Sequence, residues 1–230
     1  MYGQNKVSIK KNSLKSRYYG DVAKLYDTKR FHSRRGKFID QLEKKAIIKL
    51  INSVDNLDTV LDMPCGTGRI TQLLLDLGYN VIGADVSKDM IKIAQKKLSN
   101  YDNLLDLYHC DLANLPFENG KLDCITSIRL MGHVPQMVRV KMLREMRRVV
   151  KKCIIVSYYN PYSLKGIYRG LKSRVIKPST RWYPIPFRKL KDEVKLVNLQ
   201  TYEMEHILDG IAETYIVLIG KENDPELSGG

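Results

Sequence analysis

Strand-like and helix-like segments alternate along this chain from residue 59 onward, and this alternation limits the possible folds more than any other feature. After residue 69, for example, apolar residues recur at positions 70, 73, 74 and 77, which is the spacing of one helix face. The alternation is typical of β-α-β units, in which a helix joins two parallel strands. We therefore predict an α/β fold with a doubly wound, mostly parallel sheet. The predicted strands span residues 59–62, 80–85, 105–110, 123–128, 153–159, 194–201 and 214–220.

The composition favours a single folded domain in the cytoplasm. The chain has 230 residues, of which 43% are hydrophobic and 28% are charged, and these values are ordinary for a globular protein. No stretch approaches the roughly 20 consecutive apolar residues that span a bilayer, and no apolar run of a secretory signal follows the basic start. The four cysteines form no CxxC pair, so we expect reduced, mostly buried thiols and no metal site.

The net charge of +14 is concentrated in two segments. Residues 1–50 hold 14 basic and 4 acidic side chains, an excess of +10, and residues 160–192 hold 9 and 1, an excess of +8. The stretch between them is nearly neutral, with 14 basic and 12 acidic side chains. Residues 160–192 also contain four prolines and interrupt the alternation. A compact domain seldom contains an inert loop of thirty residues, so we interpret this stretch as an insertion or lid.

A glycine-bearing turn, VLDMPCGTGR at residues 60–69, joins the first predicted strand to its helix. Gly66 and Gly68 allow the backbone to approach a ligand closely, and the helix that follows offers unpaired N–H groups. Asp85 ends the next predicted strand, nineteen positions after Gly66. This is close to the roughly 20-residue spacing at which a carboxylate meets a ribose hydroxyl. Because parallel strands end at the same sheet edge, the turn and Asp85 predict a nucleotide site.

Four segments resemble the successive nucleotide-site motifs of one family: VLDMPCGTGR, GADVSKDMI, CDLANLPF and LDCITSIRLMGHV. They look like those of class I S-adenosylmethionine-dependent methyltransferases, particularly the small-molecule branch that includes the type 11 methyltransferases. The resemblance covers residues 19–159 well and the last strands more loosely. It implies a Rossmann-like, seven-stranded sheet with an antiparallel last strand and helices on both faces, an enzyme activity, and S-adenosylmethionine as the cofactor.

An NAD-dependent oxidoreductase is the nearest alternative with the same kind of fold. Its fingerprint, GxGxxG, differs from the turn in this sequence, where Pro64, Gly66 and Gly68 fall at every second position. Pro64 also departs from the methyltransferase pattern, because it replaces the first glycine. A proline fixes φ at a negative value and donates no N–H group to a ligand.

The resemblance assigns cofactor-binding roles to two groups of residues. Asp62, Gly66 and Gly68 match the loop that holds the methionine portion and the ribose. Asp85 matches the residue that accepts from the ribose hydroxyls, and Val86 would flank the adenine ring.

Further along the chain, Asp111 matches the side chain that faces the adenine amino group, and the Leu112 backbone would lie at the ring. Ile128 and Arg129 end the fourth predicted strand, beside the sulfonium. Residues 18–27 resemble a short helix that closes over the cofactor in this branch. Tyr19 and Tyr26 are its candidate cofactor contacts, although packing of that helix onto the sheet is an equal alternative.

The acceptor side of the predicted site has one candidate base and several aromatic residues. His133 follows the fourth strand, where a loop opens toward the methyl group, so it is the candidate general base; a structural role is the alternative. Tyr158 and Tyr159, at the end of the fifth strand, and Trp182, in the insertion, are candidate acceptor contacts; for the two tyrosines, packing in the core or at its rim is the alternative.

The acceptor is predicted from the two basic segments, which cover this side in the family fold. Cations interleaved with apolar residues suit an anionic amphiphile, a membrane surface or RNA. A small-molecule or lipid-like, anionic acceptor is the first prediction, together with a peripheral membrane contact. RNA is the second and a non-catalytic, cofactor-binding regulator the third. The sequence gives no oligomeric state.

We therefore predict one methyltransferase domain over residues 1–230. Its expected parts are a basic N-terminal helical cap (1–50), a cofactor-binding core (51–159), a basic insertion or lid (160–192), the final strands (193–222) and a frayed tail (223–230).

Overall fold

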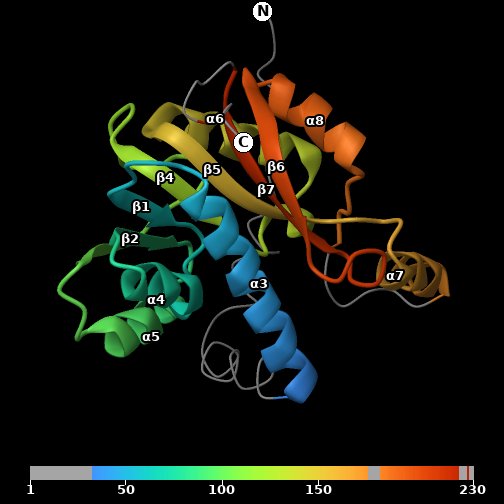
Figure 1. The fold of residues 1–230 in the computed structure, drawn as a ribbon, viewed down its shortest axis with the longest axis horizontal. Coiled ribbons are helices and arrows are strands. Elements are labelled where there is room, and N and C mark those ends of the chain that lie inside the picture. Colours follow the sequence, from blue (N-terminus) through green and yellow to red (C-terminus); the bar gives the residue numbers. More distant parts are fainter. Residues whose placement is uncertain (1–32, 176–181, 223–226, 228–230) are drawn as a thin grey trace, which may run out of the picture.

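The computed structural model describes residues 33–175, 182–222 and 227. In this part of the chain the strands form a seven-stranded sheet in the order β3-β2-β1-β4-β5-β7-β6 (Figure 1). The strands are β1 (Thr59–Asp62), β2 (Asn80–Asp85), β3 (Leu104–His109), β4 (Leu122–Ser127), β5 (Val150–Tyr159), β6 (Leu199–His206) and β7 (Thr214–Lys221).

The sheet is parallel from β3 to β5 and antiparallel at β7. β1 pairs in parallel with both β2 and β4, and β4 pairs in parallel with β5. β7 pairs antiparallel with β5 on one side and with β6 on the other. The prediction of a Rossmann-like, mostly parallel sheet with an antiparallel last strand is therefore confirmed.

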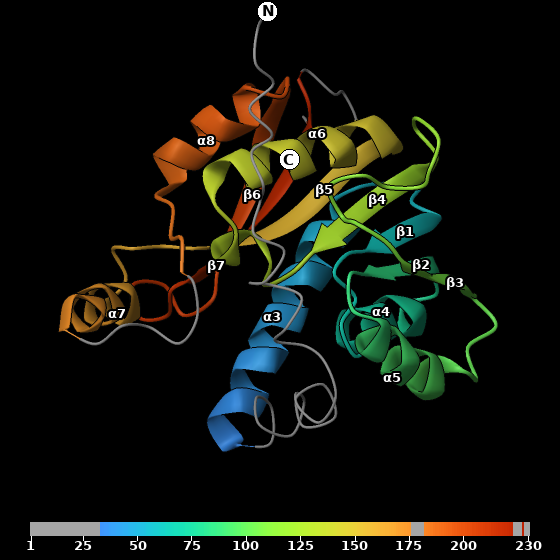
Figure 2. The same cartoon turned by 180° about the vertical axis from the view of Figure 1, so that it is seen from behind.

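Helices cover both faces of the sheet, as predicted (Figure 2). On one face, α3, α4 and α5 form a core with β1 and β2, in which Leu50, Leu74 and Leu98 are fully buried. On the other face, α6 and α8 pack against β4, β5 and β7. The helices are α3 (Arg34–Asn52), α4 (Arg69–Asp76), α5 (Lys88–Leu98), η2 (Met131–His133, a 3₁₀ turn), α6 (Gln136–Val149), α7 (Leu164–Val175) and α8 (Phe187–Lys195).

The prediction of a strand at residues 194–201 was wrong in its first half. Val194 lies in α8, and the strand itself begins at Leu199. Leu190 and Val194 are one helical turn apart and both are fully buried against the α6 side of the sheet, so tertiary packing stabilises a helix here. The apolar run that suggested a strand is therefore the buried face of α8 followed by the start of β6.

Near the end of the chain, Leu227 is 9% exposed and belongs to the core on the α3 side. The other residues of the predicted tail, 223–226 and 228–230, lie outside the described residues. Among the residues that the structure describes, no helix combines the length and the apolar character needed to cross a membrane.

A buried ion pair joins α6 to α8. The Arg139 guanidinium donates two hydrogen bonds to the Glu193 carboxylate, at 2.9 and 2.7 Å, and a third to the Val134 carbonyl at 2.8 Å. The two side chains are only 6% and 3% exposed. Two charges in such a place stabilise the fold only as a pair, because removal of one leaves the other charge buried without compensation.

We expect Arg139→Leu to lower the free energy of unfolding by about 3–5 kcal/mol, the usual cost of a broken buried pair. The double variant Arg139→Leu/Glu193→Leu should recover much of this loss, because it leaves no lone charge. Urea denaturation of the wild type and both variants measures the difference. A double variant no more stable than Arg139→Leu would contradict the explanation.

Candidate functional site

The predicted site lies at the carboxyl-end edge of the parallel strands. In the strand order, β1 is flanked by β2 on one side and β4 on the other, so the chain crosses over between the two halves of the sheet at this point. Ligands of open α/β sheets bind outside the carboxyl ends of the strands at such a switch point. The loops after β1, β2, β3 and β4 all begin at this edge.

The glycine loop after β1 has the backbone that its sequence predicts. Gly66 and Gly68 have φ values of +55° and +83°, in the left-handed region that favours glycine. The Cys65 N–H donates to the Ala84 carbonyl of β2 at 2.9 Å, and this bond holds the loop against the sheet. A Cβ atom on Gly66 would have no atom of the described residues within 4 Å, whereas one on Gly68 would lie 2.8 Å from Leu98 Cδ1. Among the described residues, Gly66 thus has space beside it, and Gly68 allows α5 to pack closely.

Asp85 binds the glycine loop directly. Its Oδ2 accepts the Gly66 N–H at 2.9 Å, and its Oδ1 accepts the Ser87 N–H at 2.8 Å. A carboxylate can accept about four hydrogen bonds, so Asp85 retains capacity beyond these contacts. Burial raises the pKa of Asp85, and the Ser87, Gly66 and Val86 N–H groups oppose this rise. The carboxylate is thus held in place with capacity left for a ligand hydroxyl.

Asp62, at the end of β1, is 1% exposed and lies beneath the loop. Its Oδ2 accepts from the Thr71 hydroxyl of α4 at 2.7 Å, and its Oδ1 accepts from the Thr126 hydroxyl of β4 at 2.9 Å. Burial raises the pKa of Asp62 from its usual 3.8 to about 6, and the two hydroxyls and the Arg69 charge oppose the rise. Near neutral pH the folded protein therefore contains a buried carboxylate that is ionised at a cost.

A charged network connects α3 to the loop after β4. Arg129 binds Glu43 through two contacts, from Nε to Oε2 at 2.9 Å and from Nη2 to Oε1 at 2.7 Å. Arg69 of α4 contacts the same carboxylate at 3.2 Å and also pairs with Asp40. The Arg129 N–H donates to the Ser157 hydroxyl of β5 at 2.6 Å, while Arg129 itself has a φ of +63°. These contacts fix the backbone that follows β4.

On the other side of this loop, His133 and Tyr159 form a pair. His133 Nε2 lies 3.2 Å from the Tyr159 hydroxyl, and the two rings pack edge to face with centroids 5.3 Å apart. A Cβ atom on Gly132 would lie 2.1 Å from the Tyr159 ring, so only glycine allows this approach. The structure therefore brings together two of the predicted acceptor-side residues.

The segment after residue 181 lies over this pair. The Tyr183 N–H donates to the Gly132 carbonyl at 2.8 Å, and the Ile185 N–H donates to the Tyr159 carbonyl at 2.9 Å. The neighbouring Trp182 stacks with Arg169 of α7, whose guanidinium carbon is 5.2 Å from the ring centroid. The predicted insertion thus contacts the loop after β4 and the end of β5.

Comparison with known proteins shows what this arrangement resembles. Residues 60–153 match the family model described as a methyltransferase domain. The demethylmenaquinone methyltransferase of Bacillus licheniformis is 34% identical over 118 residues, 48% of this chain and 50% of that protein. The same enzyme of Clavibacter sepedonicus is 28% identical over 175 residues, 74% of this chain and 69% of that protein. The chain spans about half the length of the first relative.

Over residues 60–153, the chain is thus similar to a methyltransferase domain. Among solved structures, magnesium protoporphyrin IX methyltransferase from Synechocystis PCC 6803, with bound SAH, superposes with a TM-score of 0.71. It shares 18% identity, over 90% of this chain and 98% of the other, so the likeness is one of fold. The predicted resemblance to methyltransferases is therefore supported over residues 60–153, and S-adenosylmethionine as the cofactor is part of the function proposed below.

The residues of the methyltransferase domain fit this cofactor. The remaining hydrogen-bond capacity of Asp85 suits a ribose hydroxyl, and the absence of described atoms within 4 Å of a Cβ position on Gly66 allows close approach. At the end of β4, the Ser127 hydroxyl is buried and has no hydrogen-bond partner among the residues that the structure describes. A polar ligand group at this edge would satisfy it.

Other predicted cofactor contacts lie along the same edge. The Val86 carbonyl is 3.1 Å from His109 Nε2, and the Asp111 side chain accepts the Ala113 N–H at 3.0 Å. Leu112 and Ile128 are buried, at 3% and 5% exposure. The site roles of all these residues remain predictions. Tyr19 and Tyr26 lie outside the described residues.

The structure adds contacts for two predicted residues. The Arg129 guanidinium pairs with Glu43. Tyr158 is fully buried and stacks on Tyr215, with centroids 5.9 Å apart. Burial raises the pKa of Tyr158, and its ring lies in the core between the sheet and α8.

Sequence reasoning missed Glu43. The sequence contained a signal for it, namely a glutamate within an apolar helix face. By their spacing, this face is formed by Ile39, Glu43, Ala46, Ile47 and Leu50. A glutamate on an apolar face is rarely buried unless it is paired. The partner could not be inferred from the same pattern.

We expect Asp62→Asn to stabilise the protein at neutral pH and to impair cofactor binding. The folded pKa is raised, so the favourable contribution of Asp62 is complete below pH 3.8 and is lost as the pH rises through about 6. At about 1.4 kcal/mol per pKa unit, the asparagine variant would gain up to about 3 kcal/mol above pH 6.

Thermal or urea unfolding between pH 4 and 8 measures this difference. The variant should be more stable than the wild type at pH 8 and close to it at pH 4. Equal stability across the whole range would contradict a raised pKa for Asp62.

Proposed function

We propose that this chain transfers a methyl group from S-adenosylmethionine to a small-molecule, lipid-like and anionic acceptor. The observation that carries the proposal is the His133–Tyr159 pair, which lies beside the cofactor edge and beneath residues 182–185 of the basic insertion. An acceptor held there would meet an imidazole and a phenol, with Trp182 and Arg169 of the insertion nearby.

The cofactor supplies a methyl group on a positively charged sulfur, which is already electrophilic. The work of the protein is therefore to hold the two reactants in line, which can lower the barrier by several kcal/mol. Asp85 would orient the ribose, and the Gly66 backbone would allow close contact. The Arg129 backbone, fixed by Ser157 and Glu43, would set the wall beside the sulfonium.

His133 is the group that would accept a proton from the acceptor. A hydroxyl or carbon acceptor needs such a base, whereas a neutral amine does not. The Tyr159 hydroxyl, 3.2 Å from Nε2, would orient the imidazole. Trp182 and Tyr159 would contact the acceptor, while the buried Tyr158 would support Tyr159 from within the core.

The acceptor class is supported by the relatives and by charge. Two of the relatives are named demethylmenaquinone methyltransferases, which indicates a small-molecule acceptor. Cations next to the site would favour an acceptor that carries negative charge. The division of the chain into cap, core, insertion and final strands, and a location in the cytoplasm, are parts of the same proposal.

We expect Asp85→Asn to weaken binding of the cofactor, because asparagine offers one acceptor oxygen where the carboxylate offers two charged ones. Loss of one charged hydrogen bond costs about 1.5–3 kcal/mol, which is roughly a 10- to 150-fold weaker affinity. Isothermal titration calorimetry with S-adenosylhomocysteine measures it. Asp106→Asn on β3 is the matched control. Unchanged affinity in Asp85→Asn would remove Asp85 from the site.

We expect His133→Ala to lower turnover by about 10²- to 10⁴-fold if the acceptor must lose a proton. Cofactor affinity should stay the same, because His133 lies on the acceptor side. Tyr159→Phe should lower turnover less, since it removes only the orienting group. Full activity of His133→Ala would assign this histidine to packing.

The proposal is tested by incubating the protein with methyl-labelled S-adenosylmethionine and a cell extract, followed by fractionation. Label in organic-soluble or aqueous small molecules is the expected result. Label that is sensitive to ribonuclease would replace the proposal with an RNA methyltransferase. Cofactor binding without any labelled product in the extract would favour a regulator.

A further inference from the structure

Helix α7 carries an apolar stripe on its outer side. Leu164, Ile167, Tyr168, Leu171 and Val175 follow the spacing of one helix face and are 48–87% exposed. An amphipathic helix in a globular protein normally turns this face toward the core. Here the apolar face points away from the protein.

The first turn of α7 is attached to the loop between β6 and β7. The Leu164 and Lys165 N–H groups donate to the carbonyls of Gly210 and Ile211, at 2.9 and 3.1 Å. By helical spacing Gly166 lies on the side opposite the stripe, and a Cβ atom there would be 2.4 Å from the Asn160 carbonyl oxygen. The stripe therefore points away from this backbone contact.

A buried glutamate also fixes the orientation of α7. Glu213 is 2% exposed and accepts from Arg169 at 2.8 Å, and it pairs with Lys165 at 3.2 Å. The helix could not rotate its apolar stripe inward without separating this carboxylate from its cations. Such a separation would leave a buried charge without compensation.

Cations flank the stripe. The sequence of α7, LKGIYRGLKSRV, contains four basic residues and no acidic one. By helical spacing, Lys165 and Lys172 lie along one border of the stripe and Arg174 along the other. Apolar residues between two rows of cations are typical of helices that lie in the interface of an anionic bilayer.

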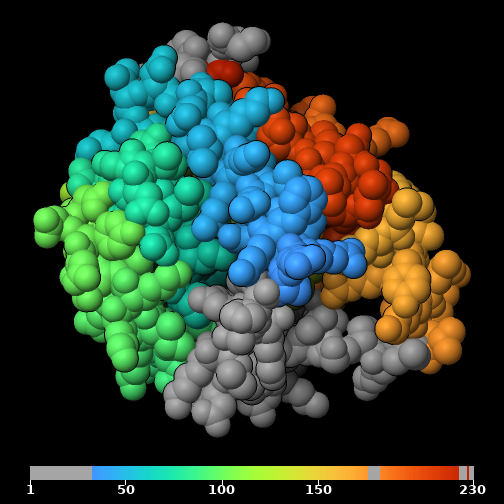
Figure 3. Space-filling view, turned by 60° about the horizontal axis from the view of Figure 1, so that its bottom comes forward, coloured from blue at the N-terminus to red at the C-terminus, as the bar shows by residue number. Residues whose placement is uncertain are grey.

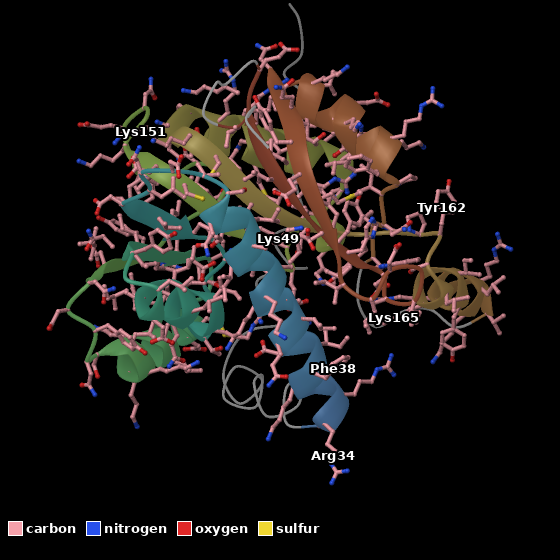
Figure 4. The ribbon with its side chains drawn as sticks, in the orientation of Figure 1. Arg34, Phe38, Lys49, Lys151, Tyr162 and Lys165 are labelled. Atoms are coloured by element: carbon pink, nitrogen blue, oxygen red, sulfur yellow. The ribbon has the colours of Figure 1, made fainter. Side chains whose placement is uncertain are left out.

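A second group of residues lies at the same end of the molecule. The first turns of α3 carry exposed Arg34, Arg35 and Lys37 next to Phe38, which is 50% exposed. Figure 3 shows the start of α3 and α7 on one face, and Figure 4 shows Arg34 and Phe38 on α3 and Tyr162 at the start of α7. The face also borders the carboxyl-end edge of the sheet, since α7 follows β5.

We propose that this face, α7 with the first turns of α3, docks on the surface of an anionic lipid bilayer. The inference deepens the proposed function and rests on it for the lipid-like nature of the acceptor. If the apolar stripe enters the bilayer, residues 160–192 and the His133–Tyr159 pair come to the membrane surface. A lipid-like acceptor is dissolved there. The cations would lie at the level of the lipid headgroups.

The cations and the apolar residues of this face argue against two other binding partners. A second copy that docked by the same face would bring Lys165, Lys172 and Arg174 of both chains together, and like charges repel. RNA would neutralise these cations but would leave Leu164, Ile167 and Leu171 in water. An anionic bilayer matches both the apolar stripe and its cationic borders.

The test uses vesicle co-sedimentation of the full chain with phosphatidylglycerol-rich vesicles, and with pure phosphatidylcholine vesicles for comparison. We expect the double variant Ile167→Ser/Leu171→Ser to bind at least about tenfold more weakly than the wild type, because the stripe loses two apolar side chains that would enter the bilayer. Leu105→Ser/Leu196→Ser is the matched control, since these leucines are also exposed, at 54% and 62%, but lie outside α7. The control should bind like the wild type.

A charge-matched pair tests the cations. Lys172→Glu on α7 and Lys121→Glu before β4 change the net charge equally. A lysine near an anionic surface contributes about a fivefold gain in binding, so reversal at position 172 should cost at least that factor. The control at position 121 should cost little. Trp182, the single tryptophan of the chain, lies against α7 and gives a fluorescence readout of docking.

Three results would overturn the docking surface: no binding to anionic vesicles, equal binding by the stripe variant and the wild type, or a dimer in solution that the stripe variant abolishes. Cofactor binding by calorimetry and labelling of an acceptor are measured separately. Methyl transfer without vesicle binding would overturn this inference alone. Vesicle binding that depends on the stripe, without methyl transfer, would overturn the proposed function and leave the docking surface in place.

Discussion

The cofactor side of the site depends on the Asp85 carboxylate, which joins two neighbouring strands at the same edge of the sheet. It accepts the N–H of Gly66, in the loop after β1, and that of Ser87, at the start of α5. Both bonds orient the carboxylate before any ligand arrives. The first of these bonds joins the carboxylate to Gly66, whose φ is positive, so one buried carboxylate links the glycine loop to the end of β2.

Buried charge recurs in this protein, with two different consequences. Asp62 and Asp85 have raised pKa values because burial disfavours their ionised forms, and neutral hydroxyl and N–H groups compensate only part of that cost. Such groups lower stability and are typical of functional sites. The pairs Arg129–Glu43 and Arg139–Glu193 instead combine opposite charges and tie α3 and α8 to their neighbours. The free-energy cost of burying charge is thus only partly offset at Asp62 and Asp85, whereas opposite charges offset it in the two ion pairs.

In the folded protein, some of the excess basic side chains form ion pairs and others remain exposed. Lys165 and Arg169 hold α7 in place through Glu213, so part of the basic insertion is structural. Exposed cations remain around the apolar stripe of α7 and on the first turns of α3. This combination of a fixed helix, an outward apolar face and a cationic border gives the insertion a physical role that net charge alone does not specify.

The sequence by itself determined the sheet, the glycine loop and the placement of Asp62 and Asp85. These features follow from local periodicity, from residues with special backbone freedom and from the rule that parallel strands end at one edge. Only the tertiary structure decided that residue 194 lies in a helix and that Glu43 pairs with a residue 86 positions away. It also decided that the apolar face of α7 points outward. Helical spacing predicts that such a face exists, but contacts distant in sequence, here with Gly210, Ile211 and Glu213, set its direction.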